Sequence, residues 1–188
     1  MTAILTGGFA DPAVQSAQAF RALLEAMARP GRIHAVAGAA PPAPLSVAAG
    51  VALLTLTDST TPVYLAGAAD CDGLRGWIAF HTGAPLVGAG LAQFAVGTWA
   101  DLLPVTRFRI GEPAWPDRSA TLIVETDRLE PQGARLTGPG IATEARLTLP
   151  ETAAFQANRA LFPLGFDVIL TCGDRLAALP RSTRVEDI

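Results

Sequence analysis

The stretch FPLGFDVILTCGDR, residues 162–175, carries the strongest fold signal in the chain. Residues 166–171, which are apolar except for Asp167 and Thr171, are typical of a core strand. The following Cys172-Gly173-Asp174 favours a turn, and residues 176–179 are again apolar, as a partner strand requires. The sequence therefore predicts a core hairpin near the carboxyl end of the chain.

Upstream of this hairpin, helix and strand signals alternate. Asp11-Pro12 predicts a helix start, and residues 20, 23, 24 and 27 recur at helical spacing as a predicted core face. Ser46 caps a second helix, 47–57, which has no polar side and should be buried all round. The other predicted elements are strands at 32–37, 62–66, 93–96 and 120–125, a helix from Asp70 or Asp72 to His81, a helical turn at 100–103, a proline-rich loop at 112–117, a hairpin of 135–137 with 141–143, and a helix at 150–162.

This order of elements predicts an α/β fold with a mixed sheet covered by helices. The 188 residues suit a single domain spanning 1–188, with enough chain to bury a core without a disulfide or a metal. Half of the residues are apolar and only 16% are charged. A surface so poor in charge indicates contact with another protein chain.

Composition excludes several chemistries. All 14 basic residues are Arg, and the absence of Lys rules out a Schiff base to pyridoxal phosphate and a phosphate loop that needs Lys. The net charge of −3 with scattered Arg excludes nucleic acid as the main partner. Two isolated cysteines indicate free thiols in a reducing cytoplasm, and prolines interrupt the one long apolar window, so no membrane span is expected.

Two polar segments of the first half are candidates for function. His81 ends a predicted helix, where it either interacts with the helix dipole or acts as a general base or phosphate donor. Asp58-Ser59-Thr60-Thr61 follows the buried helix and is either a helix-ending turn or a polar ligand contact. No HExxH pattern or other metal-ligand spacing occurs, so we expect no metal site.

Two further candidates lie in the second half. Gly138-Pro139-Gly140 is either a tight turn or a nest of backbone N–H groups for a phosphate, although Pro139 has no N–H to offer. Arg181, with Ser182 and Thr183, either belongs to a solvated tail or binds a phosphate or phosphonate, since a guanidinium and hydroxyls suit that group.

Five segments in register resemble one family, the PhnH subunit of the bacterial carbon–phosphorus lyase system. The resemblance covers nearly the whole chain and rests on FRALLEAM (20–27) with Pro30-Gly31, LLTLTD (53–58) with Thr61-Pro62-Val63, FHTGAPLV (80–87), LTGPGI (136–141), and the stretch 162–175 continuing to Pro180-Arg181-Ser182-Thr183.

The resemblance implies a fold similar to pyridoxal-phosphate-dependent transferases but without the cofactor. It also implies membership of a complex with the PhnG, PhnI and PhnJ subunits. This complex, helped by PhnL, transfers the ribose triphosphate of ATP to an alkylphosphonate and releases adenine. It assigns no catalytic residue. The matching candidates for substrate binding are Asp58, His81, Thr82, Gly138, Gly140, Arg181 and Thr183.

Three functions remain open on this basis. The chain either contributes to nucleotide or phosphonate handling within the complex, or it is a scaffold subunit without chemistry of its own. The third alternative is an independent homodimeric protein that binds a small nucleotide or phosphonate. A homodimer is also expected of the isolated subunit, because an apolar patch freed from its partner self-associates.

Overall fold

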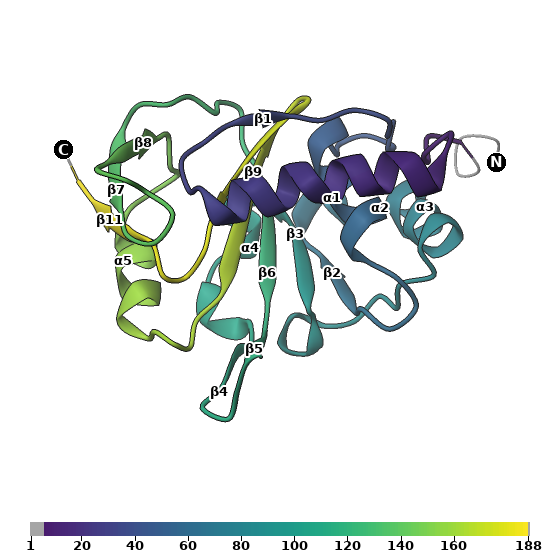
Figure 1. Cartoon of the computed structure of the whole chain (residues 1–188). Helices are drawn as coiled ribbons and strands as arrows, with labels where there is room; N and C mark the ends of the chain where they lie inside the picture. Colours follow the sequence, from purple (N-terminus) through teal and green to yellow (C-terminus); the bar gives the residue numbers. More distant parts are fainter. Residues whose placement is uncertain (1–5, 188) are drawn as a thin grey trace.

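A computed structural model describes residues 6–187. Its centre is a six-stranded sheet in the order β1-β10-β9-β6-β3-β2 (Figure 1). The four strands β2, β3, β6 and β9 are parallel, whereas β10 and β1 are antiparallel to their neighbours. The predicted mixed α/β sheet is thus confirmed. The strands of this sheet are β1 His34–Ala35, β2 Val63–Leu65, β3 Phe94–Thr98, β6 Thr121–Glu125, β9 Asp167–Cys172 and β10 Arg175–Leu179.

The predicted core hairpin is β9 with β10. Cys172 pairs with Arg175, so Gly173 and Asp174 form a two-residue loop, and Gly173 takes a positive φ of 60° that the turn requires. The Gly173 carbonyl accepts from the Ala48 N–H, and the Asp174 carbonyl accepts from the Val36 N–H. The hairpin loop therefore fixes both the second helix and the edge strand.

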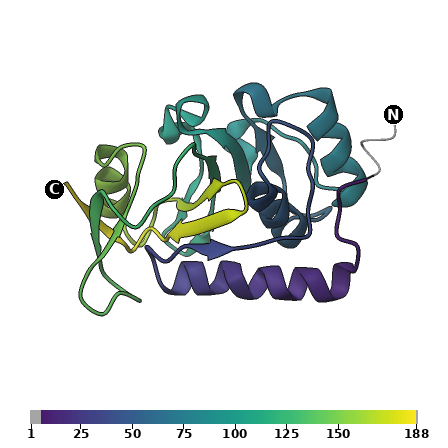
Figure 2. The same ribbon diagram turned by 90° about the horizontal axis from the view of Figure 1, so that it is seen from above.

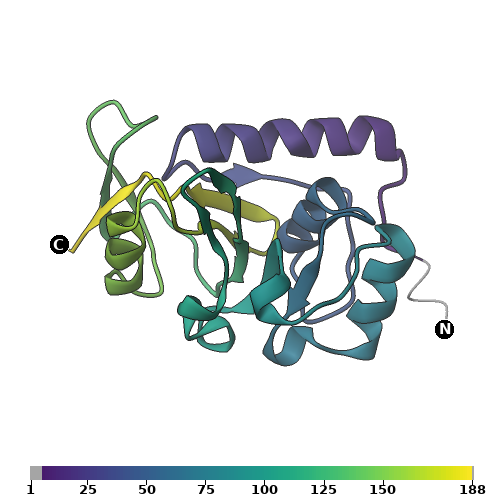
Figure 3. The same ribbon diagram turned by 90° about the horizontal axis from the view of Figure 1, so that it is seen from below.

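Helices cover both faces of the sheet. α1 (Pro12–Ala28), α2 (Val47–Leu56) and α3 (Asp72–His81) bury their apolar sides in one core with alternate residues of the strands. α1 runs along one side of the molecule (Figure 2) and packs on α2 and β10. The opposite core holds α4 (Trp99–Leu102), α5 (Ala153–Ala160) and a small sheet of β7 (Ala134–Thr137), β8 (Ala145–Leu147) and β11 (Arg184–Glu186). Figure 3 shows α1 and α5 on different sides of the main sheet. Short 3-10 helices span Gly67–Ala69, Ala89–Leu91 and Val105–Arg107.

Local signals set the helix starts. Asp11 caps α1 by accepting from the Val14 N–H at 3.3 Å, and Ser46 caps α2 by accepting from the Ala49 N–H at 3.2 Å. The predicted core face of α1 is only partly right. Leu23 is buried, but Phe20 and Leu24 are 51% and 56% exposed.

Four predicted elements need correction. The loop predicted at 112–117 is a hairpin of β4 (Ile110–Glu112) and β5 (Trp115–Ser119), which projects from the body in Figure 1. The partner of β7 is β8 at 145–147 instead of 141–143, because residues 138–144 make a longer connection. The strand predicted at 32–37 shortens to β1, and the helix predicted at 150–162 shortens to α5. Within residues 6–187, no helix is long and apolar enough to cross a membrane.

Candidate functional site

Arg181 lies at the amino ends of the parallel strands, in an ion pair with Asp167, the first residue of β9. The Arg181 Nε donates to Asp167 Oδ1 at 3.1 Å, Nη2 donates to Oδ2, and the backbone N–H donates to Oδ1 at 2.8 Å. The guanidinium also donates to the Pro116 carbonyl, at 2.7 Å, and to the Ser119 hydroxyl. The two charged side chains are only 13% and 16% exposed.

This arrangement overturns the solvated-tail interpretation of Arg181. Every nitrogen of the guanidinium has a protein acceptor, so a phosphate would have to displace Asp167 or its neighbours. A buried pair of this kind neutralises both charges and fixes the hairpin to the segment that follows it. The geometry favours a structural role for Arg181.

Gly138, Gly140 and Thr183 gather beside the carboxyl end of α1. A Cβ on Gly140, whose φ is 82°, would lie 2.0 Å from the Ala28 carbonyl oxygen, and one on Gly138 would lie 3.2 Å from the Ser182 carbonyl oxygen. Thr183 is buried, and its hydroxyl has no hydrogen-bond partner among residues 6–187. Because backbone already fills the space against both glycines, the tight-turn interpretation fits better than a phosphate nest.

Asp58 and Thr82 also serve local structure. Asp58 Oδ1 accepts from the Thr60 N–H and the Thr60 hydroxyl, both at 2.7 Å, and these hydrogen bonds lower the pKa of Asp58. The Thr82 hydroxyl donates to the Ile78 carbonyl at 2.8 Å and accepts from the Ala84 N–H at 3.1 Å, which closes α3. The turn after α2 and the end of α3 are neighbours, because a Cβ on Gly83 would lie 3.8 Å from Ser59 Cβ.

His81 holds the amino-terminal segment against α3. Its Nε2 lies 3.2 Å from the Thr6 carbonyl oxygen, which also accepts from the Trp77 indole N–H at 3.1 Å. The imidazole contacts the ring of Trp77 at a centroid distance of 5.1 Å, and a Cβ on Gly8 would lie 2.5 Å from its Nδ1. These contacts give His81 a packing role.

The sequence-predicted residues therefore form two separate groups. Asp58, His81 and Thr82 lie around the end of α3, whereas Gly138, Gly140, Arg181 and Thr183 lie near the start of β9 and the end of α1. Neither group combines an acid or base with an unoccupied phosphate-binding side chain. Among the described residues, no cluster of three or more His, Cys, Asp or Glu side chains is arranged to hold a metal ion.

An open groove of about 560 Å³ lies beside Arg181 at the amino ends of the strands. One wall comes from α1, through Leu24 and Met27, and the other comes from Phe162 and Pro163. A smaller apolar hollow of about 220 Å³ adjoins the groove, since Leu24 and Met27 line both. The groove is thus mainly apolar, with the Arg181–Asp167 pair at one side.

The carboxyl ends of the strands hold a residue that sequence reasoning missed. Glu125 ends β6, in register with Thr98 of β3 and Thr171 of β9. Its carboxylate accepts from the Ser46 N–H at 2.7 Å and from the Thr171 hydroxyl at 3.0 Å. Burial raises the pKa of Glu125, and these hydrogen bonds partly offset the effect. The sequence signal was a lone carboxylate closing the apolar run 120–125.

Glu125 borders a cleft of about 370 Å³ together with Thr98, Trp99, Arg128 and Leu149. The carboxyl ends of parallel strands are where open α/β sheets usually bind ligands. A carboxyl group with a raised pKa at such a place is suited to proton transfer or to accepting ligand hydroxyls. We therefore regard Glu125 as the strongest candidate for an acid–base or ligand-binding side chain in this structure.

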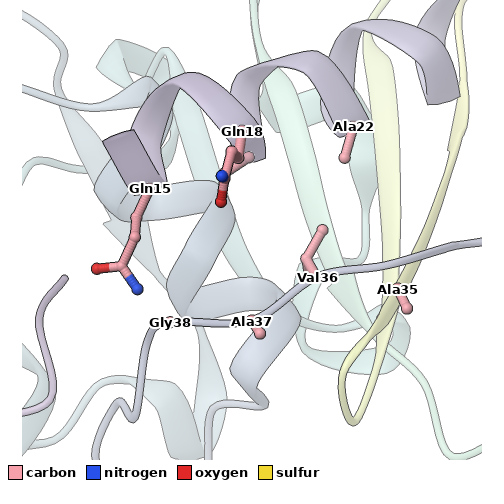
Figure 4. A pocket seen from close by; sticks show the side chains of 8 residues that line it. Gln15, Gln18, Ala22, Ala35, Val36, Ala37 and Gly38 are labelled. Atoms are coloured by element: carbon pink, nitrogen blue, oxygen red, sulfur yellow. The ribbon is translucent and has the colours of Figure 1, made fainter. Parts of the chain in front are cut away.

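A fourth cavity, of about 220 Å³, lies between α1 and the edge strand (Figure 4). Gln15 and Gln18 reach into the space between the helix and residues 35–38. The Gln15 Oε1 accepts from the Asp11 N–H at 2.8 Å, so this side chain supports the start of α1. The remaining lining is small and apolar, which offers little to fix a ligand.

Comparison with known proteins gives consistent matches. The family described as "Bacterial phosphonate metabolism protein (PhnH)" matches residues 7–186. The alpha-D-ribose 1-methylphosphonate 5-triphosphate synthase subunit PhnH of Rhizobium meliloti (strain 1021) is 40% identical over 193 residues, covering 97% of this chain and 96% of that protein. The putative C-P lyase subunit protein HtxG of Stutzerimonas stutzeri is 33% identical over 180 residues, covering 89% and 84%.

Proposed function

The chain belongs to the PhnH family of bacterial phosphonate metabolism proteins, and from this we propose that it is an accessory subunit of a ribose 1-methylphosphonate 5-triphosphate synthase. The observation that carries the proposal is the 40% identity, over nearly the full length of both chains, to a protein named as a subunit of that synthase. The match to a C-P lyase subunit supports the same assignment.

The proposed reaction exchanges substituents at the anomeric carbon of ATP. The bond from ribose C1′ to adenine N9 breaks, a bond from C1′ to a phosphonate oxygen forms, and adenine leaves with a proton. ATP and the alkylphosphonate are the substrates of the complex. We assign this chain no cofactor, because it has no Lys to bind pyridoxal phosphate covalently.

An accessory role fits the side chains better than a catalytic one. Arg181 is fully engaged with Asp167 and its neighbours, and His81 is engaged with the amino-terminal segment. Both side chains are thus engaged in contacts within the chain. We propose PhnG, PhnI, PhnJ and PhnL as the partners, the cytoplasm as the location, one domain over residues 1–188, and a homodimer when the chain is isolated.

A contribution to catalysis is the second candidate, and Glu125 favours it. The raised pKa and the adjoining cleft suit a group that donates or accepts a proton.

The likeness to pyridoxal-phosphate-dependent transferases also remains a proposal. It comes from the family resemblance, whereas the mixed sheet with helices on both faces supports only the coarser α/β class.

The test is to co-express the companion subunits with and without this chain and to measure adenine release from ATP and methylphosphonate. The proposal predicts that release requires the chain, and release without it would contradict membership of the synthase. Glu125→Gln then separates the two roles in complexes of normal composition. An accessory subunit retains release, whereas loss of a general acid or base lowers it by roughly 10²- to 10⁴-fold.

A further inference from the structure

One side of α1 is an apolar stripe that the core covers only in part, at Met27. Phe20, Leu24 and Met27 follow one another at spacings of four and three residues, so they lie on one helix face. Phe20 and Leu24 are 51% and 56% exposed. All three line the apolar hollow at the amino ends of the strands, and the latter two also line the larger groove.

The opposite wall of the groove is apolar as well. Phe162, which follows α5, is 50% exposed, and Pro163 lies beside it in the groove lining. We call the surface formed by Phe20, Leu24, Met27, Phe162 and Pro163 the amino-end face. Contiguous exposed apolar surface that extends over two hollows is unusual on a protein that meets only water. It is typical of the buried centre of a protein–protein interface.

The rim of this face carries positive charge. The Arg159 guanidinium lies over the Phe162 ring at 4.8 Å, and on the projecting hairpin the Arg118 guanidinium lies over the Trp115 ring at 4.6 Å. Neither arginine has a carboxylate partner among residues 6–187. Within the groove, Arg181 is neutralised by Asp167. The other carboxylate in the groove lining, Asp117, has no salt bridge to another residue in the range 6–187.

We propose that the amino-end face docks an apolar segment of a companion subunit whose rim is acidic. The inference rests on the proposed function, which supplies a complex to join, and it adds where and how this chain joins it. Apolar side chains of the partner fill the hollows beside Leu24, and partner carboxylates pair with Arg159 and Arg118. Arginine and large aromatic side chains are the residue types that dominate binding energy at such contacts.

The experiment compares two exposed apolar positions of the same helix, using this chain co-expressed with its companion subunits. Leu24→Asp places a carboxylate in the amino-end face, and Val14→Asp makes the same kind of change at a 50% exposed position in the first turn of α1. We expect Leu24→Asp to weaken co-purification at least tenfold and Val14→Asp to leave it unchanged. Matching thermal midpoints of both isolated variants and the wild type establish that the fold is retained.

Charge reversal provides a second comparison. Arg159→Glu is expected to weaken association and to reduce its dependence on salt, whereas Arg175→Glu, at the exposed β9–β10 turn, is expected to change neither. Equal effects of the two reversals would reject an acidic rim on the partner.

The outcomes also separate this inference from the proposed function. If the wild-type chain fails to co-purify and adenine release is independent of it, the proposed function itself fails. If the wild type assembles and Leu24→Asp assembles equally well, only the docking inference is overturned. If Leu24→Asp abolishes self-association of the isolated chain without weakening co-purification, the occupant is a second copy and the inference is again overturned.

Discussion

Arg181→Ala provides a quantitative test of the ion pair at the start of β9. The substitution removes a guanidinium that is 13% exposed and leaves the Asp167 carboxylate, which is 16% exposed, without its ion-pair partner. Of the hydrogen bonds that residue 181 donates to this carboxylate, only the one from the backbone N–H remains. Breaking a buried ion pair by removing one partner costs about 3–5 kcal/mol. A chain of this size loses roughly 2–4 °C of Tm per kcal/mol, so we expect a fall of about 6–20 °C.

Unfolding in urea and by heat, followed by circular dichroism, measures this loss. A double-mutant cycle with Asp167→Ala isolates the pairwise interaction, because the second substitution removes the stranded charge. The matched control is Arg75→Ala, which breaks the exposed pair between Arg75 and Asp70 and is expected to leave the unfolding midpoint almost unchanged. A loss below about 1 kcal/mol for Arg181→Ala, with no coupling in the cycle, would refute the structural role of the pair.

Three further outcomes test individual side chains. Glu125 has a folded-state pKa above its ordinary value of 4.5. The stability of the wild type relative to Glu125→Gln should therefore decline as the pH rises from about 4.5 through the folded-state pKa. Parallel urea titrations of the two proteins that show no pH-dependent difference would contradict this. Gly140→Ala should destabilise the chain far more than the control Gly173→Ala, because both positions have positive φ but only Gly140 brings a Cβ against the Ala28 carbonyl. The control substitution is expected to cost about 1–2 kcal/mol. Equal losses of stability would show that the clash at Gly140 is absent. His81→Ala should leave adenine release by the complex within about twofold of wild type and should increase proteolytic cleavage of the amino-terminal segment that His81 contacts. Loss of adenine release in a fully assembled complex would instead indicate that His81 takes part in substrate binding or catalysis.

Elements that depend on local chemistry could be predicted from the sequence. Asp11-Pro12 and Ser46 start helices because a side-chain oxygen accepts from the backbone N–H three residues further on, and no distant residue is needed. The strands 120–125 and 166–171 were also predicted, since strands that are covered on both faces have mainly apolar centres, here residues 122–124 and 168–170.

The hairpin at residues 110–119 escaped prediction because its prolines resemble a loop. Pro113 lies in the connection, and Pro116 lies within β5, where a two-stranded ribbon leaves one edge without ladder hydrogen bonds. The same reasoning failed at 141–143, where the glycine turn predicted an immediate return of the chain. Instead Gly140 packs on the end of α1, and the chain runs on to Ala145 before it pairs.

The partner of Arg181 was within reach of the sequence. Once the β9–β10 loop is assigned to Gly173-Asp174, the register sets Val168 opposite Leu179 and brings Asp167 beside the residue after Pro180. With this register, Arg181 is predicted to pair with Asp167 in a buried ion pair, so it is no longer a free arginine that could bind a phosphate. Glu125 is different, because its two donors come from residues 46 and 171, and their approach depends on how the whole sheet is assembled.

The apolar stripe of α1 shows why periodicity alone does not define a core. Helical spacing of Phe20, Leu23, Leu24 and Met27 reports that one side of the helix avoids water, and it does not report which chain covers that side. In the structure the sheet buries Leu23, while Phe20 and Leu24 lie beyond its reach at the amino ends of the strands. The width of the stripe therefore exceeds what this chain's own core needs. Since burial of apolar surface is what such a pattern supplies, the excess is best explained by a partner subunit that completes it.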